Sequence, residues 1–434
     1  MPAFSLDPVQ TAWCAELRAM AAERLRPLAE KGEPGRVNRP LLAELGQLGL
    51  LRRLFTSGAL DLCLMRESLA YACTEAETAL ALQGLGAYPV HAYGTPAQRE
   101  RWLPPVGEGR AVAAFALSEP GAGSDAAALT LRADRAGAPG DGPDVGAPGG
   151  GGRRADASRG ESRAEVSGGG PRADVPGIEA EGGVLGAEPE GSSRWRLSGE
   201  KCWISNAPEA DFYTVFARTT PGAGARGVTA FLVPADRPGL TGTALDMLSP
   251  HPIGALGFDA VPVTGDDVLG EPDRGFRVAM GTLNLFRPSV GAFAVGMAQA
   301  ALDATLAHTA QRDAFGGKLK DLQTVAHRVA ELALRTDAAR LMVYAAATAY
   351  DEDALDVPKR AAMAKLLATE TAQYVVDAAV QMHGARALQR GHLLEHLYRE
   401  VRAPRIYEGA SEVQHGIIAK ELYKELYAES EAPR

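Results

Sequence analysis

The stretch Ile406-Tyr407-Glu408-Gly409-Ala410-Ser411-Glu412 decides how this 434-residue chain is interpreted, although a glutamate beside a glycine is common by itself. Its weight comes from three motifs that precede it in the chain. They are Ala116-Leu117-Ser118-Glu119-Pro120-Gly121-Ala122-Gly123-Ser124-Asp125, Lys201-Cys202-Trp203-Ile204-Ser205-Asn206 and Arg312-Asp313-Ala314-Phe315-Gly316. Because four motifs in a fixed order are far more specific than one, we interpret them together.

The composition bounds the possible functions. With 46% hydrophobic and 23% charged residues, the chain is typical of a globular protein with two or three domains. A net charge of −9 disfavours a nucleic-acid partner, and no apolar run approaches the ~18 residues of a membrane span. The N-terminus shows no secretory signal, so we expect a cytoplasmic protein. Four cysteines without regular spacing indicate neither a disulfide framework nor a zinc ribbon: Cys14, Cys63, Cys73 and Cys202.

Hydrophobic periodicity divides the chain into three parts. Apolar residues recur at helical spacing up to about residue 110 and again after Gly270, with one helix expected over Pro358–His383. Thr95 followed by Pro96 predicts a helix start. Between the helical parts, short apolar runs predict strands over residues 112–117, 203–205, 212–217 and 228–233.

Residues 133–194 do not fit this pattern. They contain 17 Gly and 6 Pro in 62 positions and no aromatic residue. Such a segment has too little apolar surface to offset the entropy of ordering it. We therefore predict a disordered insertion between the first two strands of the middle domain.

In their order and separations, the four motifs resemble the acyl-CoA dehydrogenase family, FAD enzymes that desaturate acyl thioesters. The resemblance covers nearly the whole chain apart from the insertion. It implies an α+β multidomain fold with an N-terminal all-α domain (1–112), a middle β-barrel-like domain (113–268) and a C-terminal four-helix bundle (269–434).

The resemblance also implies the FAD-binding residues. Ser118 would bond the flavin ring, Trp203 would stack on it and Ser205 would bond near its reactive nitrogen. Arg312 suits the pyrophosphate because its planar fork offers paired donors. The complete set is Phe115, Leu117, Ser118, Gly123, Ser124, Trp203, Ile204, Ser205, Arg312, Phe315, Leu322, Gln323, Gln381, Gly384, Ala385, Ala410 and Glu412.

Glu408 is the residue that the resemblance assigns as catalytic base. A positioned carboxylate must take the weakly acidic α-proton of the thioester while flavin N5 accepts the β-hydride. One branch of the family places its base immediately before the arginine at position 287, but Phe286 there cannot abstract a proton. Burial between flavin and acyl chain should raise the pKa of Glu408. The expected substrate-contact residues are Ser124, Thr219, Asn284, Arg287, Tyr407 and Gly409.

The implied partners are an acyl-CoA substrate, an electron-transfer flavoprotein and further copies of the chain. In the family the Arg312 motif contacts the FAD of a neighbouring subunit, which implies a homotetramer built as a dimer of dimers. One motif departs from the family: Ala385 and Ala387 stand where glycines are usual after Gly384. If either position needs glycine's backbone freedom, FAD affinity falls.

Four alternatives stay open at this point. The same scaffold could carry an oxidase or a monooxygenase, or a dehydrogenase acting on a carrier-protein-bound acyl group. His392-Leu393-Leu394-Glu395-His396 matches a zinc-peptidase pattern, which we interpret as a chance match. The last alternative is a non-catalytic helical binding protein, which the absence of bound flavin would indicate.

Overall fold

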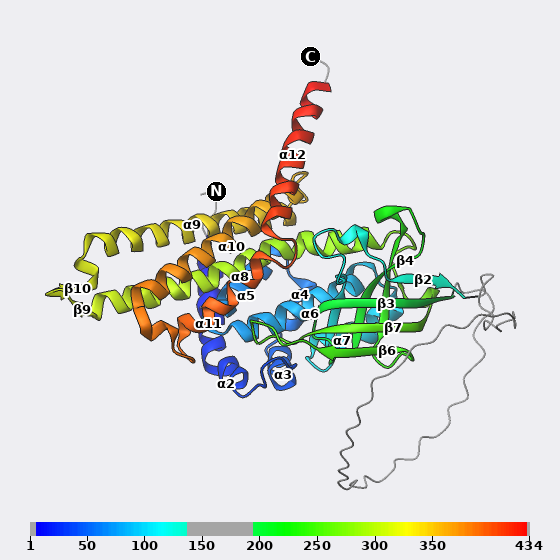
Figure 1. Cartoon of the computed structure of the whole chain (residues 1–434), viewed down its shortest axis with the longest axis horizontal. Coiled ribbons are helices and arrows are strands. Elements are labelled where there is room, and N and C mark those ends of the chain that lie inside the picture. Colours follow the sequence, from blue (N-terminus) through cyan, green and yellow to red (C-terminus); the bar gives the residue numbers. More distant parts are fainter. Residues whose placement is uncertain (1–5, 137–193, 432–434) are drawn as a thin grey trace, which may run out of the picture.

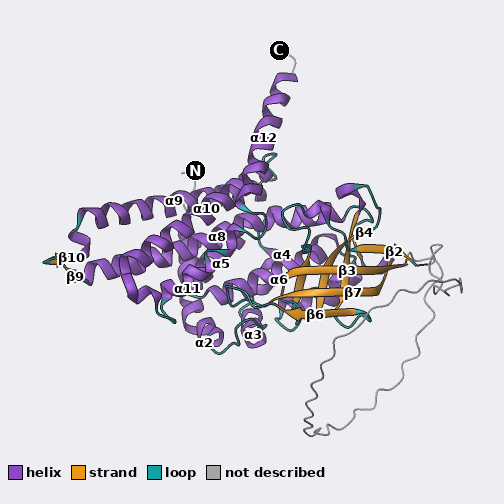
Figure 2. Cartoon of the chain, viewed as in Figure 1, coloured by secondary structure: helices purple, strands orange, loops and turns teal. Residues whose placement is uncertain are grey.

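The computed structural model describes residues 6–136 and 194–431 (Figure 1). Helices make up both ends of this described chain, and a sheet stands between them in sequence and at one end of the molecule in space (Figure 2). This is the arrangement predicted from the change of periodicity near residues 110 and 270.

The N-terminal part is helical throughout. Apolar residues at helical spacing, such as Leu17, Ala21 and Leu25, are buried, as the periodicity predicts. Thr95 caps a helix by accepting from the Gln98 backbone N–H at 3.2 Å, which confirms the predicted start. The elements are α1 (Pro8–Met20), a π-helical turn (Ala21–Leu25), α2 (Arg26–Ala29), α3 (Arg39–Gln47), α4 (Leu50–Thr56), α5 (Ala59–Ala72), α6 (Thr74–Tyr93) and α7 (Pro96–Gly107).

The middle part is one mostly antiparallel sheet with the order β6-β7-β3-β2-β4-β5-β8, and β1 pairs with β4 in parallel. No pairing among the described strands joins β6 to β8, so the sheet of this barrel-like domain is not closed through those two strands. The strands are β1 (Ala113–Ala116), β2 (Arg132–Arg135), β3 (Arg194–Ser205), β4 (Phe212–Arg218), β5 (Val228–Pro234), β6 (Leu240–Ala244), β7 (Ile253–Thr264) and β8 (Val268–Leu269).

The predicted bounds of the insertion, 133–194, include residues of two strands. The insertion also follows the second strand of the domain rather than the first. Residues 133–135 belong to β2 and residue 194 begins β3, and these two strands pair with each other. The segment therefore follows the second strand, and the composition of Gly and Pro averaged over it concealed the short strand at its edge. Of the rest of the segment, residue 136 is described and residues 137–193 lie outside the described chain.

The sheet is joined to the helices by close backbone contact. A Cβ on Gly86 of α6 would lie 2.6 Å from the Ala114 nitrogen, so only glycine permits β1 to approach this helix. Gln83, also on α6, donates to the Ala111 carbonyl and accepts from the Ala113 N–H, both at 2.7 Å. These contacts fix the strand from which the Ala116–Asp125 motif emerges.

The C-terminal part begins with α8 (Gly275–Gln311), which is long and apolar enough to cross a membrane by composition but is mostly buried in the protein. It packs against α5 and α10. The helix α12 projects away from the rest of the molecule (Figure 1). The remaining elements are the β9–β10 hairpin (Asp313–Ala314 and Gly317–Lys318), α9 (Gln323–Asp351), α10 (Val357–His383), α11 (Leu393–Glu400) and α12 (Ser411–Glu431).

Candidate active site

Glu408 lies on a short loop between α11 and α12 and has a positive φ of 53°. Its backbone carbonyl accepts from Arg287 Nε of α8 at 3.1 Å and from Gln414 Nε2 of α12 at 3.2 Å. The next carbonyl, of Gly409, accepts from Lys365 Nζ of α10 at 2.7 Å. Side chains from three helices therefore fix a backbone conformation that a non-glycine residue seldom adopts.

Glu408 is half-buried, and its Oε2 is enclosed without a hydrogen-bond partner among the described residues. Burial raises the pKa of Glu408 because the charged form is poorly solvated. The positive charges of Arg66, Arg287 and Lys365 act in the opposite direction. A carboxyl group with an unpartnered oxygen and a raised pKa is suited to accept a proton.

Lys365 and Gln414 were not predicted as site residues. Both side chains are fully buried, and burial lowers the pKa of Lys365 to about 8. The sequence carried one signal for the lysine, which stands between Ala364 and Leu366 on an otherwise apolar helix face. A buried lysine of this kind needs a partner, and the carbonyl of Gly409 supplies it.

The predicted flavin wall is formed by β1 and β3. The backbone N–H of Cys202 donates to the carbonyl of Ser118 at 3.0 Å, which brings the first and second motifs together. Pairing of β3 with β7 shifts register between Lys201 and Ile204, and within this bulge Trp203 has a φ of 57° and is 48% exposed. The bulge therefore directs the Trp203 indole away from the sheet, where a bound ligand can pack against it.

Two of the predicted cofactor residues point elsewhere. Leu117 and Ile204 are in the core, with exposed fractions of 7% and 1%, so only their backbone can meet a cofactor. Phe115 packs on Phe216 with ring centroids 4.9 Å apart. These positions belong to the strands that carry the site rather than to its open face.

A buried ion pair that we did not predict joins the same two motifs. Lys201 Nζ donates to Glu119 Oε1 and to the Leu117 carbonyl, each at 2.9 Å, and the lysine is fully buried. Glu119 also accepts from the backbone N–H of Thr130 at 2.6 Å and of Leu131 at 2.9 Å. The pair fixes the turn after β1 against β3.

The residues of this wall fit a flavin. A flat ring can cover the exposed indole of Trp203, and the half-buried Ser118 and Ser205 offer hydroxyl groups at its edge. A Cβ placed on Gly121 or Gly123 would meet no atom within 4 Å, so the turn faces open space. Ser124 is exposed beside it.

The third motif lies elsewhere, at the far end of the bundle (Figure 1). Arg312 comes directly after α8 and 25 positions after Arg287. At 1.5 Å per residue, this separation corresponds to roughly 37 Å along the helix axis. Phe315, in the β9–β10 hairpin, is 90% exposed. Stacking of His308 on His383, at 4.1 Å between ring centroids, brings the end of α10 to the same place.

The predicted cofactor residues therefore fall into two groups that one chain does not bring together. Beside the Glu408 loop or on the wall lie Phe115, Leu117, Ser118, Gly123, Ser124, Trp203, Ile204, Ser205, Ala410 and Glu412. At the bundle end lie Arg312, Phe315, Leu322, Gln323, Gln381, Gly384 and Ala385.

The expected substrate residues are distributed around the loop and the sheet. Arg287, Tyr407 and Gly409 are in or against the Glu408 loop, and Asn284 lies one turn earlier on α8. The Thr219 hydroxyl already donates to Asp273 Oδ1 at 2.6 Å. A thioester arm would have to compete with that carboxylate for this hydroxyl.

The zinc-peptidase pattern does not assemble a metal site in the described part of the chain, which holds no group of three potential ligands. His392 Nδ1 accepts from the Leu394 backbone N–H at 3.1 Å and caps α11. His396 Nε2 is 2.5 Å from the Thr74 hydroxyl, and Glu395 pairs with Arg399 at 2.8 Å.

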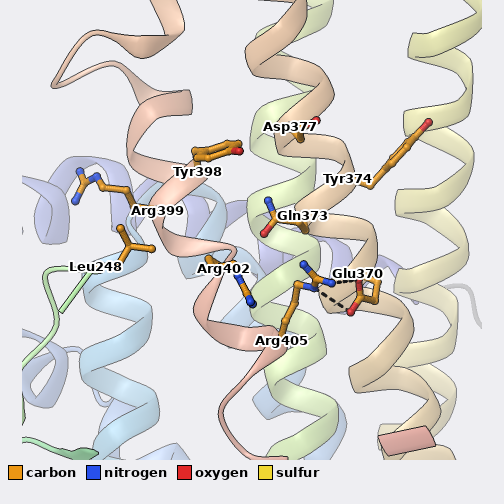
Figure 3. A pocket seen from close by; sticks show the side chains of 9 residues that line it. All are labelled: Leu248, Glu370, Gln373, Tyr374, Asp377, Tyr398, Arg399, Arg402 and Arg405. Atoms are coloured by element: carbon orange, nitrogen blue, oxygen red, sulfur yellow. Dashed lines mark hydrogen bonds and ion pairs between the residues drawn. The ribbon is translucent and has the colours of Figure 1, made fainter. Parts of the chain in front are cut away.

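A cavity of about 540 Å³ lies beside the segment that leads to Glu408 (Figure 3). Arg405 in its wall pairs with Glu370 on α10 at 2.9 Å, as the dashed lines show. No predicted catalytic, cofactor or substrate residue lines it. Its lining residues are Leu248, Glu370, Gln373, Tyr374, Asp377, Tyr398, Arg399, Arg402 and Arg405.

Comparison with known proteins identifies the family. Models of the N-terminal, middle and C-terminal domains of acyl-CoA dehydrogenase match residues 7–110, 172–261 and 273–423. A cyclohexane-1-carbonyl-CoA dehydrogenase from Geobacter metallireducens is 30% identical over 94% of this chain and 96% of its own length. A short-chain specific acyl-CoA dehydrogenase from Bos taurus is 35% identical over 77% of this chain and 69% of its own.

The fold has a solved counterpart as well. The structure of butyryl-CoA dehydrogenase from Megasphaera elsdenii superposes with a TM-score of 0.78 at 28% identity and covers 97% of this chain and 99% of that one. Three domain models in sequence order, a relative matching 94% of the chain and a solved structure covering 97% of it confirm the expected α+β multidomain fold. The chain belongs to the acyl-CoA dehydrogenase family, the FAD-dependent oxidoreductases that act on CH–CH groups.

Proposed function

We propose that this protein desaturates an acyl-CoA thioester between its α and β carbons, with Glu408 as the base. The observation that carries the proposal is the Glu408 carboxyl group, which has a raised pKa and an enclosed Oε2 without a partner among the described residues. The name of one relative gives a cyclic acyl group and that of another a short-chain one, so the names alone do not choose the acyl group.

The proton has a defined destination in this scheme. The α C–H bond breaks and its proton goes to Glu408 Oε2, while its electron pair forms the new double bond as the β-hydrogen leaves as hydride. Negative charge develops on the thioester oxygen. The backbone N–H of Glu408 donates no hydrogen bond within the described chain, so it is available to that oxygen. A preorganised donor of this kind contributes about 3–4 kcal/mol.

FAD, when bound, supplies the hydride acceptor at flavin N5. Trp203, Ser118 and Ser205 would hold its ring, and the open turn at Gly121 to Ser124 would hold its phosphates.

A second copy of the chain would complete the cofactor site. Arg312 and Phe315 are at the opposite end of α8 from Arg287, and Phe315 is 90% exposed. An exposed arginine and phenylalanine suit the phosphates and the adenine of a cofactor held by a neighbour. We propose a homotetramer built as a dimer of dimers, with an electron-transfer flavoprotein as the electron acceptor.

The test is anaerobic addition of a panel of acyl-CoAs to the purified flavoprotein, followed by its visible spectrum. We expect one or more acyl-CoAs to bleach the flavin in the wild type and none to bleach it in Glu408→Gln. Flavin that is present but never reduced would contradict the proposal, and a carrier-protein thioester would then be tried. Rapid reoxidation of the reduced flavin by air would indicate an oxidase or monooxygenase instead.

A further inference from the structure

Residues 406–410, with Glu408 at their centre, form a sharp bend between a 3₁₀ turn (Ala403–Arg405) and the start of α12. Glu408 and Gly409 have successive positive φ values of 53° and 99°. Two left-handed residues in a row turn the chain abruptly. We call residues 406–410 the bend, and the direction in which it presents the Glu408 carboxyl group depends on what holds it.

Side-chain packing contributes little to the position of the bend. Ile406 and Tyr407 are 56% and 38% exposed, and Gly409 has no side chain to pack. Glu408 itself is half-buried. Polar contacts must therefore hold the bend in place.

One carboxylate joins the two ends of the bend. Glu370 of α10 accepts through Oε1 from Arg405 Nε at 2.9 Å, and its Oε2 lies 2.9 Å from Arg405 Nη2. The two side chains face each other in the wall of the cavity (Figure 3). The Ser411 hydroxyl donates to the same Oε1 at 2.5 Å. The residue before the bend and the residue after it are thus bound to a single side chain.

These contacts are of a strong type. Two N–H···O bonds from one guanidinium fix the geometry of an arginine–carboxylate pair, and a hydroxyl forms a short bond to an ionised carboxylate. Burial raises the pKa of Glu370, but the hydrogen bonds from Ser411 and Arg405 outweigh it and hold that pKa below its ordinary value. Because the pKa of Glu408 is raised instead, Glu370 is ionised at every pH at which Glu408 can act as a base.

The other side-chain contacts that the described residues make with the bend hold only its middle. Lys365, Gln414 and Arg287 bind the carbonyls of Glu408 and Gly409. A bend held at its middle can still pivot about those contacts, whereas contacts at both ends fix its direction as well. Direction matters for proton transfer, since a displacement of about 1 Å can cost roughly 100-fold in rate.

We propose that Glu370 is a positioning residue for the base: by binding Arg405 and Ser411 together, it sets the direction in which the Glu408 carboxyl group faces the α-carbon of the thioester. The inference rests on the proposed desaturation and adds a residue to the machinery of that reaction. Glu370 acts through the bend and takes no proton itself.

A purely structural role is the competing explanation. The side chains of Arg405 and Glu370 keep 31% and 39% of their surface exposed, and ion pairs this accessible contribute little to overall stability. The two explanations differ in what is lost with the pair. A structural role lowers the unfolding temperature and the flavin content along with the rate, whereas a positioning role lowers the rate alone.

The experiment compares the wild-type holoenzyme with Glu370→Ala by anaerobic stopped flow, using butyryl-, octanoyl- and palmitoyl-CoA. With the probe that reduces the wild type fastest, we expect the limiting rate constant of flavin reduction to fall about 10- to 100-fold. The Kd of the probe, the flavin content and the unfolding midpoint should stay near their wild-type values.

Three results would go against this expectation. An unchanged limiting rate constant, or a loss confined to Kd, would overturn the inference. A fall in rate that is matched by loss of flavin or of thermal stability would assign Glu370 to the structural role. A wild-type flavin that none of the three probes reduces would overturn the proposed desaturation, and the inference with it.

The pH profile separates position from charge. Removing a negative charge near Glu408 would favour its ionised form and lower its pKa, so a direct effect of the Glu370 charge would make the variant relatively faster at low pH. Misdirection of the carboxyl group acts equally at all pH values. We therefore expect the deficit of Glu370→Ala to be constant from about pH 6 to pH 9, and a deficit that changes across this range would contradict the inference.

Removing the two donors tests the same contacts from the other side. Arg405→Met with Ser411→Ala leaves Glu370 in place and should lower the limiting rate constant to a similar extent. Adding Glu370→Ala to this variant should cause no further loss, because residues that act as a unit are not additive. Losses that multiply would contradict the inference, and the donor variant decides the question if Glu370→Ala does not fold.

The matched control is Glu395→Ala. Glu395 binds Arg399 through the same two kinds of bond, Nε to Oε1 at 2.8 Å and Nη2 to Oε2 at 3.3 Å. Both partners belong to α11, so this pair does not join the ends of the bend. Its removal should leave the limiting rate constant within about twofold of wild type. A loss as large as that of Glu370→Ala would show that the effect is not specific to the bend.

Discussion

The Glu408 loop and the β9–β10 hairpin carry two halves of the predicted site in opposite physical conditions. The loop lies against α8, α10 and α12 with Glu408 half-buried, and three side chains hold its two carbonyls. The hairpin is exposed, and its Lys318–Asp313 pair is on the surface. Burial can shift a pKa and orient a base, whereas an exposed hairpin can only contact what comes to it.

We therefore expect the two regions to have different roles. Within one chain, the loop holds the reacting carboxylate in a fixed geometry. The hairpin residues gain a function only when a ligand or another copy of the chain covers them. Changes at the loop should therefore act on the reaction, and changes at the hairpin on the affinity for FAD.

The largest expected effect is on the chemical step. Glu408→Gln should lower the rate constant of flavin reduction by about 10³- to 10⁴-fold, since general-base catalysis contributes up to this amount. Stopped-flow absorbance with excess acyl-CoA measures this constant. The flavin content should stay at the wild-type level, and a loss of flavin together with the rate would show that the loop holds the cofactor as well.

The two regions should also differ in stability. Lys201→Met leaves the carboxylate of Glu119 buried without its counter-charge and should lower the free energy of unfolding by about 3–5 kcal/mol. Lys318→Met removes an exposed pair and should change it by less than about 1 kcal/mol. Urea unfolding followed by tryptophan fluorescence compares the two variants, and similar losses would contradict the contrast.

At the hairpin the expected effect is on binding. Arg312→Ala should weaken FAD binding by about 10- to 100-fold, as expected for a lost charge-assisted hydrogen bond to phosphate. Flavin fluorescence titration of the apoprotein gives the affinity. With saturating FAD, the rate of flavin reduction should return to the wild-type value. A rate that stays low would place Arg312 in the reaction rather than in cofactor binding.

Features of the fold could be predicted from the sequence where the interacting residues lie close together along the chain. Helical spacing predicted the burial of Leu17, Ala21 and Leu25, and Thr95 before Pro96 predicted the start of α7, because these signals are local. Glu408 was identified from a contiguous motif. The family comparison confirms the fold class, while the roles of the individual site residues stay predictions.

The side-chain pairs that the sequence did not predict join distant segments. Lys201 and Glu119 are 82 positions apart, and Arg66 and Ser289 are 223 apart, so their pairing depends on how strands and helices pack. The β2 strand was missed because only four residues at the edge of a Gly-rich segment form it. In each case the determining neighbour is supplied by tertiary structure.

The smallest effect tests whether Lys365 tunes the base. Burial raises the pKa of Glu408 and the Lys365 charge lowers it, so Lys365→Met should raise that pKa further. Because only the ionised carboxylate accepts a proton, the rising limb of flavin-reduction rate against pH should move to higher pH. At pH 6 the rate should be roughly 3- to 10-fold below wild type.

The difference should disappear at alkaline pH, which distinguishes tuning from misplacement of the loop. The pKa of Lys365 is lowered to about 8, so the wild-type lysine itself becomes neutral above that pH and no longer assists Glu408. The Gly409 carbonyl keeps a donor in the variant, since Gln414 Nε2 reaches it at 2.9 Å. Rates that converge above about pH 9 would therefore assign Lys365 to electrostatic tuning. A deficit that is constant across the pH range would assign it to holding the loop.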